Sequence, residues 1–148
     1  MLDTFVPRHI RRLVLAVVPA FAFGSACKND VSIEPDVLAG SYAATSFLVT
    51  QSGQPTVDVI AKGGSLLITI AADSTTTGLL SLPAGVLSPQ GGTASMAGRV
   101  HQRADGTFRF DQTGEETFIE ALIWQQFTGA LVSTTFLSNT QFQITLRK

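Results

Sequence analysis

Residues with reactive side chains are scarce in this sequence. Its 148 residues include one cysteine, Cys27, and two histidines, His9 and His101. A single cysteine excludes an intramolecular disulfide. Beyond the N-terminal segment, His101 alone leaves too few ligands for a zinc site. We therefore expect no metal site and no cofactor.

Charged residues are also few, at 14% of the chain against 45% hydrophobic residues, and the formal net charge is −1. Without residues 1–26, seven basic and ten acidic residues remain, which gives a net charge of −3. Such a mildly acidic surface has no basic field to attract nucleic acid. We therefore expect no nucleic-acid partner.

Catalytic motifs are missing as well. The chain has no Gly-x-Ser-x-Gly motif and no phosphate-binding loop. Its one carboxylate cluster is Glu115, Glu116 and Glu120, for which a glycosidase-type pair is the functional alternative. We prefer a non-catalytic explanation to the glycosidase-type pair. Glu115 and Glu116 are expected in a solvated turn, and Glu120 is expected at the rim of the barrel or at a bulge. We expect His101 on the outer surface, and we expect no enzyme.

The N-terminus has the pattern of an export signal. Arg8, Arg11 and Arg12 precede an uncharged apolar run over 13–23. Eleven residues rise about 16 Å as a helix, which is too short to cross a hydrocarbon core of about 30 Å. The pattern is typical of a signal-peptide helix rather than of a permanent transmembrane helix.

The sequence Gly24-Ser25-Ala26-Cys27 follows the apolar run. It resembles the lipobox of bacterial lipoproteins, which implies cleavage before Cys27 and acylation of its thiol. We therefore expect a lipoprotein signal peptide at 1–26 and a lipid-anchored linker at 27–37. The protein would then be exported and anchored to the cell envelope, on the periplasmic or outer membrane face. The alternative is an ordinary signal peptide in which Cys27 is incidental.

From residue 38 onward, Thr, Ser, Gly, Val and Phe are frequent, and several segments alternate between apolar and polar residues. This pattern predicts half-buried strands separated by short turns. The expected strands lie at 40–50, 64–72, 76–82, 93–102, 107–112, 116–125, 130–136 and 141–147. We predict that 38–148 is an all-β domain, an eight-stranded antiparallel up-and-down barrel with one short helix. An open sheet or a two-sheet sandwich is the alternative.

Some segments need separate treatment. Thr56, the apolar residues after it and Gly63 predict a short helix at 57–62, lying across an open end of the barrel. Both faces of 117–125 are apolar, which leaves a bulged strand and a helix as alternatives. In the first strand, alternation places four residues on one face: Ala43, Thr45, Phe47 and Val49.

Gly40 and Tyr42 open the first predicted strand, and Arg147 lies on the last. A Gly-x-aromatic opening and an Arg on the final strand of an eight-stranded barrel resemble the lipocalin-like families. The order of segments is similar to that of small bacterial lipoproteins with a lipocalin-like domain. The resemblance implies that Tyr42 plugs the closed end of the barrel and that Arg147 packs over it.

Two functions fit these features. The first is a membrane-tethered, non-catalytic barrel that binds a small apolar ligand or lipid at its open end, near 57–62. The second is a cell-envelope structural or interaction lipoprotein with a filled barrel, no ligand and an unknown protein partner. An eight-stranded barrel holds either packed side chains or one small ligand. Bulky residues predicted to face inward favour a barrel interior filled by side chains; they are Phe47, Leu66, Ile68, Phe108, Phe110, Phe142 and Leu146. Small residues predicted to face inward favour an interior with room for a ligand; they are Ala43, Thr45 and Gly98.

Replacement of Cys27 by serine tests the lipoprotein signal. A serine hydroxyl does not replace the thiol, so Cys27→Ser should abolish acylation and the processing that depends on it. The measurements are intact mass and membrane fractionation of the full chain expressed in a bacterial host. A Cys27→Ser protein that is still recovered as a processed lipoprotein would contradict the assignment.

Overall fold

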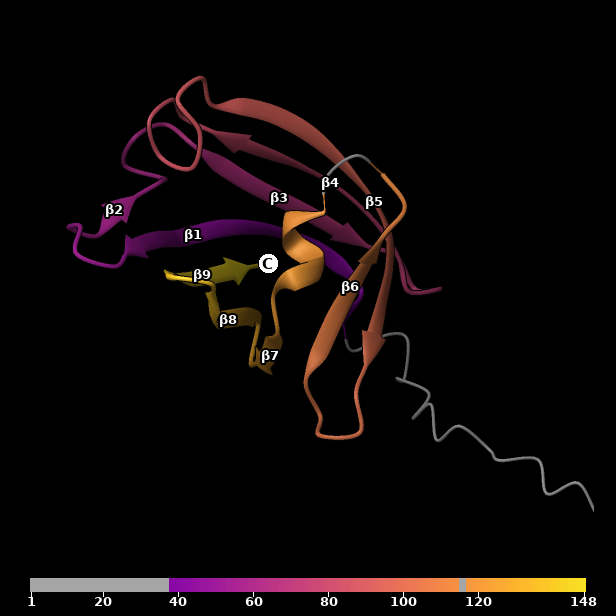
Figure 1. Cartoon of the computed structure of the whole chain (residues 1–148). Helices are drawn as coiled ribbons and strands as arrows, with labels where there is room; N and C mark the ends of the chain where they lie inside the picture. The colour runs from indigo at the N-terminus through magenta and orange to yellow at the C-terminus, as the bar shows by residue number, and fades with distance from the viewer. Residues whose placement is uncertain (1–37, 115–116) are drawn as a thin grey trace, which may run out of the picture.

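The alternating segments form strands in the computed structural model, which describes residues 38–114 and 117–148 (Figure 1). The predicted signal peptide and linker, at 1–37, lie outside these residues. The described strands are β1 (Gly40–Gln51), β2 (Val57–Asp58), β3 (Ser65–Ile70), β4 (Thr75–Leu82), β5 (Gly92–Gln102), β6 (Phe108–Gln112), β7 (Trp124–Phe127), β8 (Ala130–Leu137) and β9 (Thr140–Arg147). A 3₁₀ helix, η1 (Phe118–Ala121), lies between β6 and β7.

Eight of these strands form a closed antiparallel barrel. Neighbours follow the order β1-β3-β4-β5-β6-β7-β8-β9, and β9 pairs with β1 to complete the ring. The two-residue β2 pairs only with β1, where Val57 lies opposite Val49. Closure removes the free strand edges that an open sheet would expose. The prediction of an all-β, eight-stranded antiparallel barrel is therefore confirmed.

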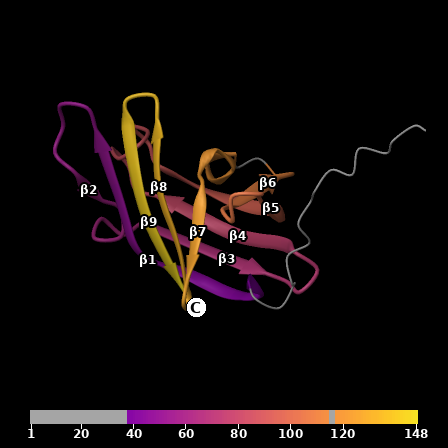
Figure 2. The ribbon, with the colours of Figure 1, turned by 90° about the horizontal axis from the view of Figure 1, so that it is seen from below.

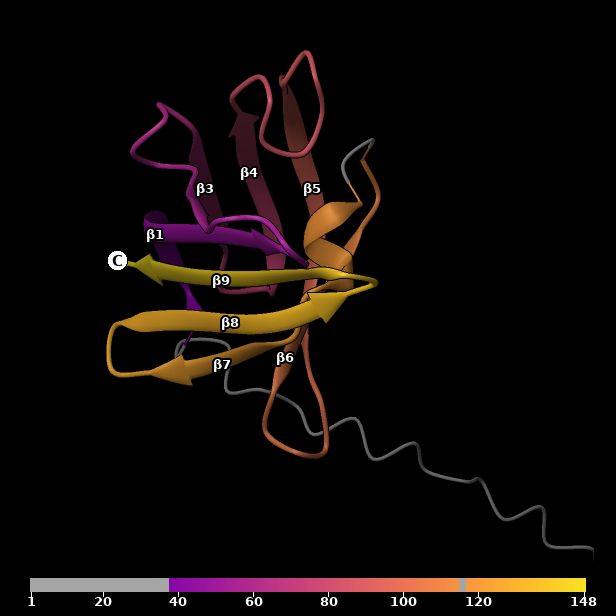
Figure 3. The same cartoon turned by 60° about the vertical axis from the view of Figure 1, so that its left-hand side comes forward.

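The strands of the barrel run in two directions. In Figure 3, β1, β9, β8 and β7 cross the view, while β3, β4 and β5 stand nearly upright behind them. Figure 2 shows the same crossing from below. β1 joins both groups, because its first residues pair with β3 while most of its length pairs with β9. The inward side chains of both groups therefore meet in one core.

β1 contains a β-bulge. Its pairing with β9 shifts register between Ala44 and Ser46, so that Thr45 is an extra residue. Before the bulge, Tyr42 is buried and Ala43 is exposed, and Thr45 is exposed as well. The prediction that Ala43 and Thr45 face the interior was therefore wrong, because an inserted residue breaks the period-two count.

The helix predicted at 57–62 does not form. Val57 and Asp58 are paired with β1, and the chain then turns over 59–63. The Oδ1 atom of Asp58 accepts a hydrogen bond from the Ala61 amide at 3.1 Å, and Gly63 adopts a left-handed φ of 85°. Cross-strand pairing prevails here because nucleation of so short a helix is unfavourable.

The observed helix, η1, lies within the segment that we predicted to be a strand at 116–125. Ile119 and Leu122 are both buried. In a strand, residues three apart face opposite sides, whereas a 3₁₀ turn brings them to the same side. The chain returns to extended backbone at Leu122, and β7 begins at Trp124. Of the two alternatives for this segment, the helix therefore holds over η1, and the strand prediction was wrong there.

Large side chains fill the barrel interior. Phe110 and Trp124 are fully buried and meet edge to face, with their ring centroids 5.7 Å apart. From η1, Phe118 packs against Phe47 and Phe142, at centroid distances of 6.1 and 4.9 Å. The other bulky residues predicted to face inward are also buried: Leu66, Ile68, Phe108 and Leu146. The interior is thus packed with aromatic and branched aliphatic side chains.

Two hairpins at the same end of the barrel share an Asp-x-Thr turn. Asp73 accepts hydrogen bonds from the amide and the hydroxyl of Thr75, at 3.0 and 2.6 Å. Asp105 accepts the same pair from Thr107 at the same distances. The hydroxyl bond is the main cause that holds the pKa of each carboxyl group below its usual range. Both turns are stabilised above the ordinary aspartate pKa, and this contribution is lost as the pH falls through the lowered pKa.

Substitutions on the two faces of β9 test the packing. Phe142 is buried against Phe118, and its neighbour Gln143 is exposed. Phe142→Asp should unfold the barrel, because loss of a core Phe costs about 3–5 kcal/mol and an unpaired buried charge costs more. Gln143→Asp should change the free energy of unfolding by less than about 0.5 kcal/mol. Far-ultraviolet circular dichroism and thermal melting measure both, and a stably folded Phe142→Asp protein would overturn the assignment.

Candidate functional site

The two ends of the barrel differ in their connections. Short turns join β3 to β4, β5 to β6 and β7 to β8 at one end, where β1 begins and β9 ends. We call this the closed end. The longer connections at 52–64, 83–91 and 113–123 lie at the other end, which we call the mouth. Ligand sites concentrate in the connections of a rigid scaffold, which directs attention to the mouth.

Apolar side chains from the mouth connections cover the interior. Val59, Val86, Ile119 and Leu122 are buried although they lie outside the barrel strands. They belong to one hydrophobic cluster with the inward residues of the strands. The mouth is therefore closed over the core by these side chains.

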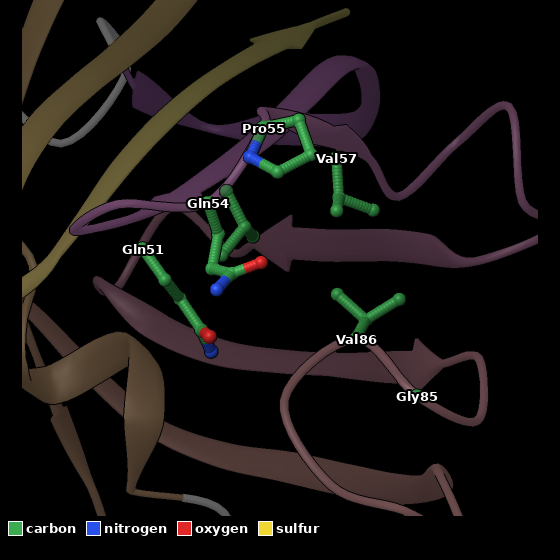
Figure 4. Close-up of a pocket in the computed structure, with 7 residues that line it drawn as sticks. Gln51, Gln54, Pro55, Val57, Gly85 and Val86 are labelled. Carbon is green, nitrogen blue, oxygen red and sulfur yellow. The ribbon is translucent and has the colours of Figure 1, made fainter.

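A pocket of about 230 Å³ lies at the mouth, between the 52–64 and 83–91 connections (Figure 4). Val57 and Val86 point toward each other across it, and Gln51 and Gln54 lie along one side. The full lining consists of Val49, Gln51, Gln54, Pro55, Val57, Gly85 and Val86. The pocket thus combines apolar walls with two amide groups that both donate and accept hydrogen bonds.

The connection at 83–91 separates this pocket from a second one. The second pocket has a volume of about 220 Å³ and lies between the connection and the strands β4 and β5. Its lining includes Leu80, Leu82, Ser88 and Gly91. Each volume is below the roughly 300 Å³ at which most small-molecule sites begin. Either pocket alone therefore suits only a small ligand.

Glycines allow the 83–91 connection to fold back on itself. Gly85 and Gly91 adopt left-handed φ values of 77° and 66°, which residues with a Cβ rarely adopt. The Gly85 amide donates to the carbonyl oxygen of Ser88 at 2.8 Å, and the Ser88 hydroxyl donates to that of Gly91 at 3.3 Å. These bonds close a compact turn that presents Val86 to the core.

At the closed end, Tyr42 is the third residue of β1 and is buried. Its hydroxyl donates a hydrogen bond to the carbonyl oxygen of Leu38 at 2.8 Å, and burial raises the pKa of Tyr42. The Nζ atom of Lys148 lies 5.5 Å from the centroid of the Tyr42 ring. A Cβ on Gly40 would lie 2.9 Å from Cε of Lys148, so glycine leaves room for this side chain.

The predicted partner of Tyr42 was Arg147, and here the structure differs. β9 alternates, so Leu146 faces the core and Arg147 is exposed on the outer face. Lys148 follows the end of the strand, and it is this residue that lies over the ring. The cation over Tyr42 is therefore Lys148 and not Arg147, the residue that the resemblance implied.

The remaining residues considered from the sequence do not meet at the mouth pocket. His101 is exposed as predicted, with its Nε2 atom 3.3 Å from Oδ2 of Asp111. Arg109 donates to Oε1 of Glu120 at 3.1 Å. Within 38–114 and 117–148, no group of three His, Cys, Asp or Glu side chains is arranged to hold a metal ion. Cys27, Glu115 and Glu116 are among the residues outside the described part of the chain.

Comparisons with known proteins add no assignment. No protein-family model, curated protein or solved structure matches the chain. In the part of the chain that the structure describes, no helix has the length and apolar character needed to span a membrane. The candidate site therefore rests on the geometry of this chain.

The sequence argument did not identify the residues of the mouth pocket. It placed the site near 57–62, and Val57 does line the pocket. Gln51 and Gln54 lay between the strand predicted at 40–50 and the helix predicted at 57–62, and Gly85 and Val86 lay between the strands predicted at 76–82 and 93–102. The only available signal was the length of these two connections at the same end of a barrel.

Titration of Tyr42 tests the closed end. It is the only tyrosine of the chain, so phenolate absorbance reports on it alone. Because burial disfavours the phenolate, its pKa in the folded protein should lie above the ordinary value of about 10. The stability that burial of neutral Tyr42 contributes is present below that ordinary pKa and is lost as the pH rises through the raised pKa. A midpoint at the ordinary value in the folded protein would show that the ring is accessible.

Proposed function

We propose that this protein is a membrane-tethered, non-catalytic β-barrel that binds a small, mainly apolar ligand at its mouth. The pocket between the 52–64 and 83–91 connections is the observation that carries the proposal. Its valine and proline walls favour an apolar body, and the amides of Gln51 and Gln54 favour one polar group on the ligand. The volume of about 230 Å³ limits the ligand to a single ring or a short chain.

The tether and the lipocalin-like relationship belong to the same proposal. The sequence around Cys27 supports acylation, which would hold the domain at the cell envelope. The eight-stranded antiparallel barrel, with long connections at one end and a buried aromatic residue at the other, is consistent with a lipocalin-like architecture. Fold likeness alone does not determine function, so the pocket remains the stronger support.

The non-catalytic part of the proposal follows from the chemistry of the pocket lining. The seven residues are valines, glutamines, a proline and a glycine, none of which is a general acid, a general base or a nucleophile. The titratable residues in ion pairs, among them His101 on β5, Asp111 on β6 and Glu120 on η1, are not part of this lining. The site is suited to binding rather than to proton transfer.

A pocket-filling substitution tests ligand binding. Val57→Trp places a large side chain in the pocket and should reduce ligand occupancy at least tenfold. Thr134→Trp, at an exposed position on β8, adds the same bulk elsewhere and should leave binding unchanged. Native mass spectrometry of residues 28–148, purified without detergent, compares each protein with its denatured mass.

Added mass on the wild type and on Thr134→Trp, but not on Val57→Trp, is the expected result. Ligand-free spectra for all three proteins would contradict the binding proposal. They would favour an envelope interaction protein with a filled barrel. A specific observation supports that second candidate, because Phe136 on β8 and Ile123 before β7 remain 68% and 43% exposed.

A further inference from the structure

A third pocket lies on the outside of the barrel near its closed end. Its volume is about 460 Å³, and it lies where the first residues of β1 pair with β3 on one edge and with the end of β9 on the other. Ala43 and Leu67 form its apolar part, Thr69 a polar part, and Arg147 and Lys148 its charged part. It is twice as large as the mouth pocket and differs from it in chemistry, because it contains two cations.

Neither cation is neutralised by a carboxylate side chain of the described residues, although Nζ of Lys148 also lies over the Tyr42 ring. The ion pairs of the described residues join His101 and Arg109 to carboxylates of the β6–η1 region, and neither Arg147 nor Lys148 takes part in one. Both side chains are exposed. The chain as a whole has a net negative charge, so this pair is a local exception on a mildly acidic protein. Such a pair attracts an anionic surface.

Exposed apolar side chains adjoin the cations. Leu67 on β3 is 47% exposed and lies opposite Leu79 on β4, which is 41% exposed. On its other side, Leu67 lies opposite Ala43 on β1, and Ala43 lies opposite Arg147 on β9. A continuous row therefore runs across four strands from a cation to two leucines. Cations beside apolar side chains match the headgroup and acyl boundary of a bilayer.

The described chain enters the barrel beside this pocket. The described chain begins at Leu38, which is bonded to Tyr42 in the wall of the pocket. Residues 27–37 number eleven, and eleven extended residues span at most about 40 Å. An acyl chain on Cys27 would therefore keep the domain within about 40 Å of the lipid surface, with the point of attachment, Leu38, at the closed end.

We infer that the outer pocket at Arg147 and Lys148 binds the phosphate group of anionic phospholipids in the membrane that holds the tether. Leu67 and Leu79 rest at the acyl boundary beside it. This inference rests on the proposed tether, and it adds the orientation of the barrel relative to the anchoring membrane. The mouth then points away from the anchoring membrane, so its ligand arrives from the aqueous compartment rather than from that bilayer.

Single labels on opposite sides of the barrel test this inference. Acylated Cys27 has no free thiol, so an introduced cysteine is the only labelling site. Thr77→Cys lies on β4 next to Leu79, and Thr134→Cys lies on β8, four strands away in the ring. The full chain, labelled with a polarity-sensitive nitrobenzoxadiazole group, is reconstituted in phosphatidylcholine vesicles with or without about one quarter phosphatidylglycerol.

Anionic vesicles should at least double the emission of the label at Thr77 and leave that at Thr134 unchanged. Each cation contributes about fivefold to partition onto an anionic surface, so Arg147→Gln with Lys148→Gln should abolish the increase. Arg147→Lys with Lys148→Arg keeps both charges and should retain it. Lys62→Gln removes a cation near the mouth and should have no effect. Thermal melting confirms that each variant is folded.

Three results would overturn the inference. They are an equal response in both vesicle types, a response at Thr134 instead of Thr77, and a response that persists in the double glutamine variant. Loss of the response in millimolar inorganic phosphate would assign the site to free anions rather than to lipid. The intact mass of the full chain shows separately whether Cys27 is acylated, and so distinguishes an absent tether from an absent lipid site. If that residue is not acylated, the same labels on a Cys27→Ser background still test the surface through vesicle sedimentation.

Discussion

The pairing of the first barrel strand with the last is the constraint on which the rest of the structure depends. Eight residue pairs join β1 to β9, from Ala43 opposite Arg147 to Gln51 opposite Thr140. This pairing closes the ring, and closure fixes an interior that the same strands must fill. It also places the beginning of β1 beside the end of β9. On its other edge β1 pairs with β3 through its first residues and with β2 nearer its end, and the bulge at Thr45 lies between these two stretches.

Strict alternation predicted the strands that have one core face and one solvent face. In β3, β6 and β9, burial alternates residue by residue as predicted. The closed barrel was predicted from the count of eight strands and from the short turns between many of them. The predictions failed where another interaction changed the period. In β1, the inserted residue Thr45 interrupts the period of two. At η1, a 3₁₀ turn replaces the period of two and buries both Ile119 and Leu122. At Val57, pairing with Val49, eight residues earlier in the chain, decided the local structure, and a helical interpretation of 57–62 alone does not include that partner.

The candidate sites were less predictable than the fold, for a related reason. Whether a barrel has room inside depends on side chains that arrive from outside the strands. Phe118 enters from η1 and packs on Phe47 and Phe142, and Val86 enters from a connection without periodicity. Composition indicated the bulk of the inward residues but not these additions. The cation at Tyr42 shows the same limit, because alternation ends with β9 and does not describe Lys148.

The seam between β6 and β7 differs from every other joint of the barrel. A single residue pair, Phe108 with Trp124, joins these strands, whereas β8 and β9 share eight. Just inside the seam, the indole nitrogen of Trp124 is buried without a hydrogen-bond partner. Of the pairs of neighbouring strands in the barrel, β6 and β7 therefore have the fewest paired residues to hold them together. We therefore expect local opening to begin at this joint, next to the unsatisfied indole donor, and amide hydrogen exchange to be fastest there among the barrel strands.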